Sequence, residues 1–222
     1  MRDAMTERFE NLFARLAQRR EGAFVPFVNL CDPDPETSLA VLETLVASGA
    51  DALELGIPFS DPCADGPVVE ASADRALANG ATPARCLDVL RRFRTAHPET
   101  PVCLMLYINL VATPGVRRFM QAAADAGADA VLIPDLPTSM REGEPAERII
   151  RDLERAKAPP ALLGFGISTP EHVRRALEAG AAGVIVGSAL VKIVSEHLGD
   201  RDAMLKALGS AAAPFKATTR TA

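Results

Sequence analysis

The stretch Ser48-Gly-Ala-Asp-Ala-Leu-Glu54 recurs with small changes as Ala126-Gly-Ala-Asp-Ala-Val-Leu132 and as Ala179-Gly-Ala-Ala-Gly-Val-Ile185. In each copy, a glycine just past a helical pattern can take the left-handed conformation that ends a helix, and a buried strand pattern follows at once. Three such helix-to-strand joints predict repeated βα units and therefore an α/β fold.

Short apolar runs that alternate with longer helical patterns extend this repeat along the chain. The runs are nearly continuous in apolar residues, as expected for parallel strands covered on both faces. Several helical patterns begin with proline near the first turn, where its missing N–H costs nothing. We predict strands at Phe24–Leu30, Ala52–Leu55, Val102–Tyr107, Ala130–Ile133, Ala161–Phe165 and Gly183–Val186, and helices that include Pro35–Ser48, Pro114–Ala126, Pro145–Lys157 and Pro170–Ala179.

The N-terminal region adds one helix, because Phe9, Leu12, Phe13 and Leu16 follow the i, i+3, i+4, i+7 spacing of an amphipathic helix. This stripe favours packing on a core over contact with a membrane or a partner. A closed barrel needs eight βα units of about 30 residues, or about 240 residues. Periodicity alone therefore leaves open two α/β folds with six strands, an incomplete barrel and a doubly wound sheet.

The bulk properties of the chain limit the classes of protein it can belong to. With 222 residues, 48% of them apolar, we expect a single domain over residues 1–215 and a flexible tail over residues 216–222. A net charge of −5 with dispersed basic residues gives no nucleic-acid footprint. No apolar run reaches the roughly 18 residues that cross a bilayer, and the charged N-terminus has no signal core. The four cysteines lack metal-ligand or disulfide spacing, so we expect reduced thiols in a cytoplasmic protein.

One acidic residue, Glu54, interrupts an otherwise apolar strand pattern close to its C-terminal end. Sites in α/β folds form at that end of the strands, and partial burial there would raise the pKa of the carboxyl towards that of a useful general acid or base. The alternative interpretation is a solvent-facing residue or a member of a buried ion pair.

Two aspartates, Asp61 and Asp65, follow Glu54 in a loop rich in proline. Beside a strand-end glutamate they could serve hydrogen bonding and proton transfer, but either could simply make an Asx turn. A metal site is disfavoured because no histidine accompanies them and calcium motifs have a different spacing.

Two successive glycine turns form a second candidate site. Gly164 and Gly166 end a predicted strand, Ser168 or Thr169 can cap the helix that follows, and Gly187-Ser188 repeats the arrangement in the next unit. Exposed N–H groups at a helix start suit a phosphate, and barrels build phosphate sites from their last two loops. The alternative is that these glycines only permit tight turns.

Together these segments resemble the α subunits of tryptophan synthase. The resemblance implies an incomplete TIM-type (β/α) barrel with the additional N-terminal helix. It also implies a cytoplasmic lyase of tryptophan biosynthesis that cleaves indole-3-glycerol phosphate by a retro-aldol reaction to indole and glyceraldehyde 3-phosphate. It is carried, in the family's order, by Glu21-Gly-Ala-Phe-Val-Pro-Phe-Val28, Leu53–Pro67, Tyr107-Ile-Asn-Leu110, Gly164-Phe-Gly-Ile-Ser168 and Gly187-Ser-Ala-Leu-Val191.

The same resemblance implies a role for each matching residue. Glu54 would be the acid/base at the glycerol hydroxyl and at C3 of the indole, and Asp65 would hold the indole N–H and stabilise positive charge on the ring. Asp61 would lie in the loop that communicates with a β subunit in an α2β2-type complex, and pyridoxal phosphate is expected only in that subunit. The indole would contact Phe27, Met105, Tyr107 and Leu132, and the phosphate would contact Gly166, Gly187 and Ser188.

The chain departs from the family mainly between about Pro137 and Pro145, where about two βα units, a pocket tyrosine and the mobile lid have no counterpart. Cys31 and Met105 also stand where the family usually has glycine and leucine. Loss of the lid would admit water and weaken catalysis. Two other functions stay open, a catalytically inactive homologue that binds a β-type subunit and an unrelated phosphate-binding isomerase or aldolase.

The absence of about two βα units also affects the sheet that we expect. We expect an open or gapped barrel of lowered stability, with Ala130–Ile133 and Ala161–Phe165 as its edge strands and a tendency to dimerise or to depend on a partner.

Overall fold

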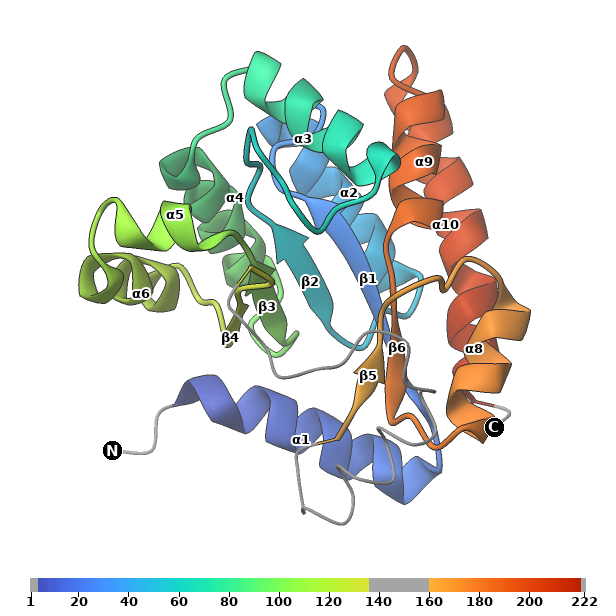
Figure 1. Ribbon diagram of the computed structural model, residues 1–222. Coiled ribbons are helices and arrows are strands. Elements are labelled where there is room, and N and C mark those ends of the chain that lie inside the picture. The colour runs from blue at the N-terminus through green and yellow to red at the C-terminus, as the bar shows by residue number, and fades with distance from the viewer. Residues whose placement is uncertain (1–3, 136–159, 221–222) are drawn as a thin grey trace.

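The fold was analysed in a computed structural model, which describes residues 4–135 and 160–220. In the described residues, each strand except β4 is followed by one or two helices, as Figure 1 shows. The elements are α1 (Ala4–Arg19), β1 (Ala23–Asn29), α2 (Pro35–Ala47), β2 (Leu53–Gly56), α3 (Pro67–Ala78), α4 (Pro83–Ala96), β3 (Val102–Met105), α5 (Ile108–Ala112), α6 (Val116–Asp125), β4 (Ala130–Leu132), β5 (Leu162–Leu163), α8 (Pro170–Glu178), β6 (Gly183–Val186), α9 (Ser188–Glu196) and α10 (Arg201–Thr219).

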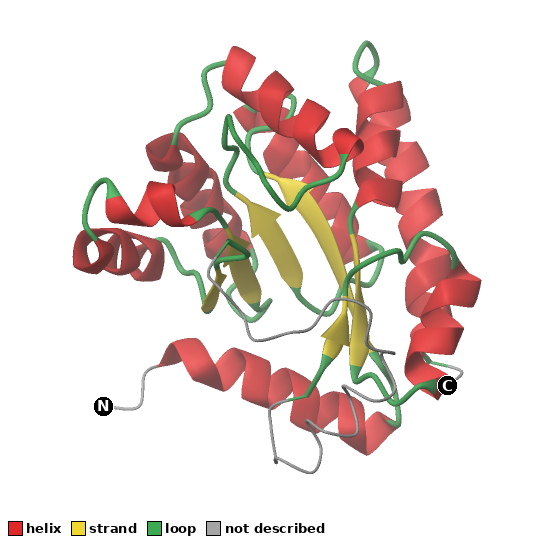
Figure 2. Cartoon of the chain, in the orientation of Figure 1, coloured by secondary structure: helices red, strands yellow, loops and turns green. Residues whose placement is uncertain are grey.

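The strands form one parallel sheet with the order β4-β3-β2-β1-β6-β5. This is the order of a ring of strands cut once, between β4 and β5, whereas a doubly wound sheet reverses direction at a switch point. Helices cover the outer side of the curved sheet and α1 crosses its lower end (Figure 2). The fold is therefore an incomplete (β/α) barrel, and the doubly wound alternative is wrong.

The cut lies where the sequence departs from the family. Within residues 4–135 and 160–220, β4 pairs only with β3 and β5 pairs only with β6. The expected edge strands are confirmed for this part of the chain. Lowered stability and a tendency to associate stay predictions, and the helix expected at Pro145–Lys157 lies outside the described residues.

The repeated joints have the expected geometry. Gly49, Gly127 and Gly180 have φ angles of +97°, +92° and +97°, in the left-handed region where a side chain would be strained. In each joint, the amide of the residue after the glycine also bonds back to a carbonyl in the last turn of the helix. The glycine thus ends the helix and turns the chain directly into the next strand.

Within the described residues, the predicted strand and helix positions are confirmed, with small differences at their ends. The third strand stops at Met105 rather than Tyr107, because Tyr107 is the N-cap of the short helix α5. The helix expected from Pro114 begins at Val116. No helix in the described parts of the chain is long and apolar enough to cross a membrane.

The N-terminal stripe packs where a core-facing helix should. Leu12 and Leu16 of α1 are buried against Val25 of β1, and Phe9 and Phe13 stack with ring centroids 6.5 Å apart. On the outer side, the strand residues beneath the helices are fully buried, among them Phe24, Leu53, Leu55 and Leu104. The helix α1 therefore closes the lower end of the sheet.

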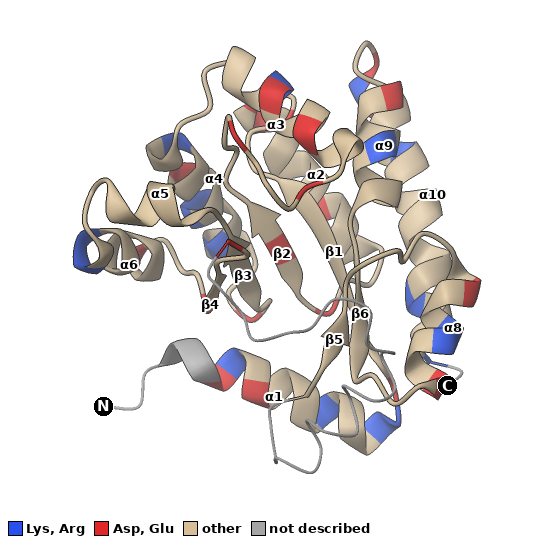
Figure 3. Cartoon of the chain, viewed as in Figure 1, with Lys and Arg blue, Asp and Glu red and all other residues tan. Residues whose placement is uncertain are grey.

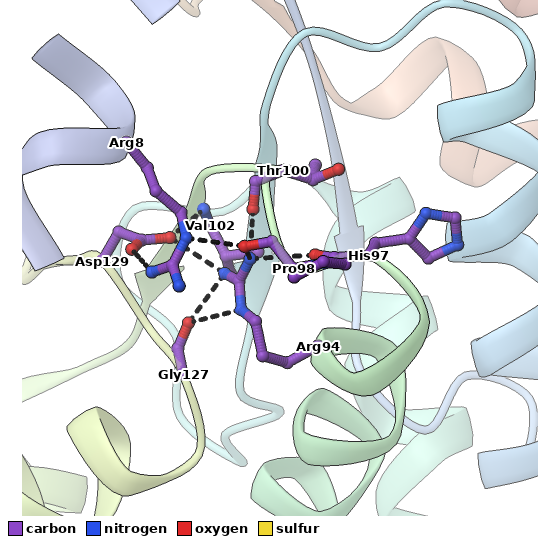
Figure 4. A network of polar contacts seen from close by, with 8 residues as sticks. All are labelled: Arg8, Arg94, His97, Pro98, Thr100, Val102, Gly127 and Asp129. Atoms are coloured by element: carbon purple, nitrogen blue, oxygen red, sulfur yellow. Dashed lines mark hydrogen bonds and ion pairs between the residues drawn. The ribbon is translucent and has the colours of Figure 1, made fainter. Parts of the chain in front are cut away.

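A network of charges also fixes this lower end (Figure 4). The fully buried Asp129 carboxylate, just before β4, accepts hydrogen bonds from Arg8 at 2.6 Å, from Arg94 at 2.9 Å and from the Val102 amide at 2.8 Å. The same Arg94 donates to the Gly127 carbonyl. The network therefore joins α1 and α4 to the starts of β3 and β4.

The flexible tail expected from residue 216 is wrong for residues 216–220. Helix α10 continues to Thr219, and Lys216 is only 6% exposed in its side chain. Its ammonium group lies 3.2 Å from Glu21 Oε2 and 2.9 Å from Asp51 Oδ2. The tail is held because these acids, distant in sequence, give its lysine a buried partner.

Cys31 has a backbone conformation that favours glycine. Cys31 has φ +64°, in the left-handed region. Its Sγ lies 3.7 Å from Sγ of Cys86 in α4, and all four cysteines are free thiols.

Candidate active site

The strand register brings the candidate residues to one face of the sheet. Phe27, Glu54, Cys103 and Ala130 lie side by side in β1, β2, β3 and β4. Because alternate residues of a strand share a face, the row two residues further on lies on the same face, nearer the carboxyl ends. That second row is Asn29, Gly56, Met105 and Leu132.

This face is the inner side of the sheet, since the residues that alternate with Glu54 are buried under the outer helices. Glu54 itself is only 6% exposed, and it is the acidic position within β2 in Figure 3. Among the described residues, its side-chain carboxyl makes no hydrogen bond or ion pair. The buried-ion-pair interpretation therefore finds no support in this part of the chain.

The environment of Glu54 alters its proton affinity. Burial, and secondly the negative charge of Asp65, raise the pKa of Glu54 to about 7. A carboxyl with this pKa is present in both protonation states near neutral pH, which suits a general acid or base.

Tyr107 holds this loop from the neighbouring strand connection. Its hydroxyl donates to Asp65 Oδ2 at 3.0 Å and accepts from the Ala64 amide at 3.2 Å. Its ring stacks on Phe59, with centroids 5.3 Å apart. The structure thus brings together Tyr107 and Asp65, which the sequence placed in different motifs.

The two loop aspartates differ in their surroundings. Burial is the largest effect on Asp65 and raises its pKa; the Tyr107 hydrogen bond opposes this, and the charge of Glu70 adds to it. Asp61 is exposed and accepts a hydrogen bond from its neighbour Ser60. Asp65 is therefore half-buried and bonded to Tyr107, whereas Asp61 is exposed.

The apolar candidates line the face around Glu54. Phe27 is buried and Met105 is half-buried, but Leu132 on the edge strand is 44% exposed. Gly56 lies in the second row, between Asn29 and Met105, and a Cβ there would come within 2.2 Å of Asn29 Oδ1 and 3.0 Å of Phe27 Cζ. The missing side chain of Gly56 therefore makes room for the Phe27 ring.

The two glycine turns lie next to each other because β5 and β6 are paired neighbours. Gly166 has φ +77°, and Thr169 caps α8 by accepting from the His172 amide. Gly187 directly precedes α9, and a Cβ on it would lie 3.3 Å from Phe27 Cδ1. The first N–H groups of a helix have no acceptor within it, so those of Ser188 and Ala189 are available to an anion.

Sequence reasoning missed some residues of this region. Cys103 shares the row of Glu54, and burial raises the pKa of its thiol to about 12. His172 Nδ1 lies 2.8 Å from the Gly166 carbonyl, and Asp135 binds the start of α5. Only the register and the folded turns reveal these contacts, since none of the residues stands in a recognisable motif.

The fold and this inner-face carboxyl define the class of the protein as a TIM-type (β/α)-barrel enzyme. A sequence model of one family, described as "Tryptophan synthase alpha chain", matches residues 13–144 and 140–220. The chain belongs to the tryptophan synthase alpha chain family.

Individual relatives agree with this assignment. The tryptophan synthase alpha chain of Photobacterium profundum is 42% identical over 266 positions, covering 96% of this chain and 99% of the relative. The alpha subunit structure from Legionella pneumophila is 32% identical with a TM-score of 0.85, covering 97% of this chain and 99% of that one. A structure of the α2β2 complex from Pyrococcus furiosus is 34% identical with a TM-score of 0.77, covering 88% and 98%.

The comparisons also confirm that this chain is shorter inside its sequence. An alignment of 266 positions with a chain of 222 residues must contain gaps, although it covers 99% of the relative. The family model matches in two segments that meet near residues 140–144. The junction falls between β4 and β5, where the ring of strands is cut.

Proposed function

We propose that the protein is a lyase that cleaves indole-3-glycerol phosphate to indole and glyceraldehyde 3-phosphate. In this retro-aldol reaction C3 of the indole gains a proton, the neighbouring glycerol hydroxyl loses one, and the carbon–carbon bond between ring and chain breaks. Family membership and the state of Glu54 support the proposal. Glu54 is the single observation that carries it, because a buried carboxyl with a pKa of about 7 can both give and take a proton.

The other site residues each bind a different part of the substrate. Asp65, held by Tyr107, accepts from the indole N–H and stabilises positive charge on the ring. Phe27, Met105 and Leu132 contact the apolar ring. The N–H groups near Gly166, Gly187 and Ser188 bind the phosphate at the turns that follow β5 and β6.

The proposal includes a partner and a location. The chain acts in the cytoplasm and passes indole to a β subunit, as the α2β2 complex of the Pyrococcus furiosus relative suggests. The exposed Asp61 lies in the loop that contacts this subunit. The chain itself needs no cofactor, and pyridoxal phosphate belongs to the β subunit.

A second function, binding of a β-type subunit without catalysis, is favoured by the cut in the barrel. Leu132, part of the proposed indole contact, is 44% exposed on an edge strand. A site that admits water in this way positions its groups less well.

Indole release from indole-3-glycerol phosphate separates the two functions, measured with and without a β subunit from a relative. We expect wild-type release, and a loss of about 10²–10⁴-fold in Glu54→Gln. Glu43→Gln, a change of the same kind on the exposed side of α2, should have no effect. Wild-type protein that releases no indole under either condition, yet binds the β subunit, would favour the binding function.

A further inference from the structure

The position of Asp65 depends on Tyr107, which makes three contacts with its loop through the hydroxyl group and the ring. The phenol donates to Asp65, the phenol oxygen accepts from Ala64, and the ring stacks on Phe59. No other described side chain hydrogen-bonds to Asp65. A displacement of Tyr107 would therefore release the carboxylate.

Tyr107 is in turn held through its backbone from the edge strand. It is the first residue of the turn into α5, and its own side chain does not cap that helix. The next amide, that of Ile108, donates to the Asp135 carboxylate, with distances of 3.0 Å to Oδ1 and 3.2 Å to Oδ2. Asp135 lies three residues after β4 ends at Leu132.

A second bond in the same place strengthens the connection. The Leu106 amide donates to the Leu132 carbonyl at 3.0 Å, so the residues on both sides of Tyr107 are bonded to the end of β4. A charge-assisted bond to a carboxylate is stronger than one between neutral groups. Of these two bonds, only that to Asp135 comes from a side chain and can be removed by substitution.

We infer that Asp135 is a positioning residue for Asp65: it fixes the start of α5 and hence Tyr107, whose hydroxyl orients the Asp65 carboxylate. This inference rests on the proposed function, in which Asp65 contacts the indole. Within the described residues, Asp135 forms no hydrogen bond or ion pair with Asp65 or with the inner-face row of Glu54. It acts on the reaction through Tyr107 alone.

The chain offers a direct probe, since Tyr107 is its single tyrosine. Protein labelled with fluorotyrosine gives one fluorine NMR signal, which reports on the ring and its hydrogen bonds without any need for activity. We expect Asp135→Ala to shift and broaden this signal, and Asp65→Asn to shift it as well. Asp135→Asn, whose amide oxygen can still accept from Ile108, should restore the wild-type signal.

Asp200→Ala is the matched control, because Asp200 caps α10 in the same way by accepting from the Ala203 amide at 3.0 Å. It should cost about 1 kcal/mol of stability and leave the tyrosine signal unchanged. In the indole assay, Asp135→Ala should lower kcat about tenfold with a smaller change in KM, because the loss is one of orientation.

The tyrosine signal decides the inference. An unchanged signal in Asp135→Ala would overturn it, whatever the activity. A shifted signal restored by Asp135→Asn would support it even if the wild type released no indole, a result that would count against the proposed function alone.

Discussion

The ammonium group of Lys216 lies 2.9 Å from Oδ2 of Asp51, although 165 positions separate the two residues in sequence. Asp51 precedes β2 and also accepts from the Phe24 amide in β1 at 2.8 Å. The pair therefore joins the last helix of the chain to the starts of two central strands.

Removing this lysine should destabilise the fold strongly. We expect Lys216→Ala to lower the free energy of unfolding by about 3 kcal/mol, because the carboxylates of Asp51 and Glu21 would stay buried without their partner. Lys206→Ala, on an exposed position of the same helix, should change it by less than about 0.5 kcal/mol. Urea unfolding measures both, and equal stabilities of the two variants would contradict the account of α10.

A methyl group at Gly56 should disturb the centre of the inner face. Its Cβ would come within 2.2 Å of Asn29 Oδ1, and Asn29 is buried and bonded to the Val69 carbonyl and to Ser72. We expect Gly56→Ala to lose about 1–3 kcal/mol of stability by overpacking. Thermal unfolding should show no such loss for Gly199→Ala, where a Cβ meets nothing within 4 Å.

A bulky side chain at Gly187 should weaken phosphate binding. Its Cβ would already lie 3.3 Å from Phe27 Cδ1, so a leucine must displace the turn before α9. Titration with glycerol phosphate should show at least about tenfold weaker binding by Gly187→Leu and unchanged binding by Gly199→Leu. Equal affinity of Gly187→Leu and the wild type would remove this turn from the site.

Glu54 should lower the stability of the protein at alkaline pH. Its raised pKa means that the folded state holds the proton more tightly than the unfolded chain, so stability is lost as pH rises from the ordinary glutamate range through about 7. Glu54→Gln, which cannot ionise, should therefore be more stable than the wild type by up to about 3 kcal/mol near pH 8.5. The gain should shrink towards pH 5, and a pH-independent difference in urea unfolding would contradict the assignment.

The sequence predicts those parts of the structure that local chemistry determines. The glycines of the three joints must take positive φ, so Gly49 and its counterparts locate both a helix end and a strand start. Glu54 can be recognised from the sequence in the same way. Burying an acidic residue in an apolar strand costs free energy, so its presence there indicates a function. Even the cut in the ring follows from the number of apolar runs and from the resemblance to longer chains.

The remaining features depend on contacts between residues that are far apart in sequence, and no local sequence pattern predicts such contacts. The charged end of the chain looks like a tail until Asp51 and Glu21 are seen beside Lys216. Asp135 looks like a loop residue until β4 and α5 are placed side by side. The contacts of Tyr107 with Asp65, Ala64 and Phe59 are of the same kind, and its expected contact with substrate stays a prediction.

The most direct test of the account is the pH dependence of kcat/KM for indole release from indole-3-glycerol phosphate. The wild type should show an inflection near pH 7, the pKa that burial and the charge of Asp65 give Glu54, and Glu54→Gln should lose the activity by about 10²–10⁴-fold. A wild-type profile that is flat from about pH 5.5 to about pH 8.5, or a Glu54→Gln variant with undiminished kcat/KM, would contradict the central claim that Glu54 moves the proton.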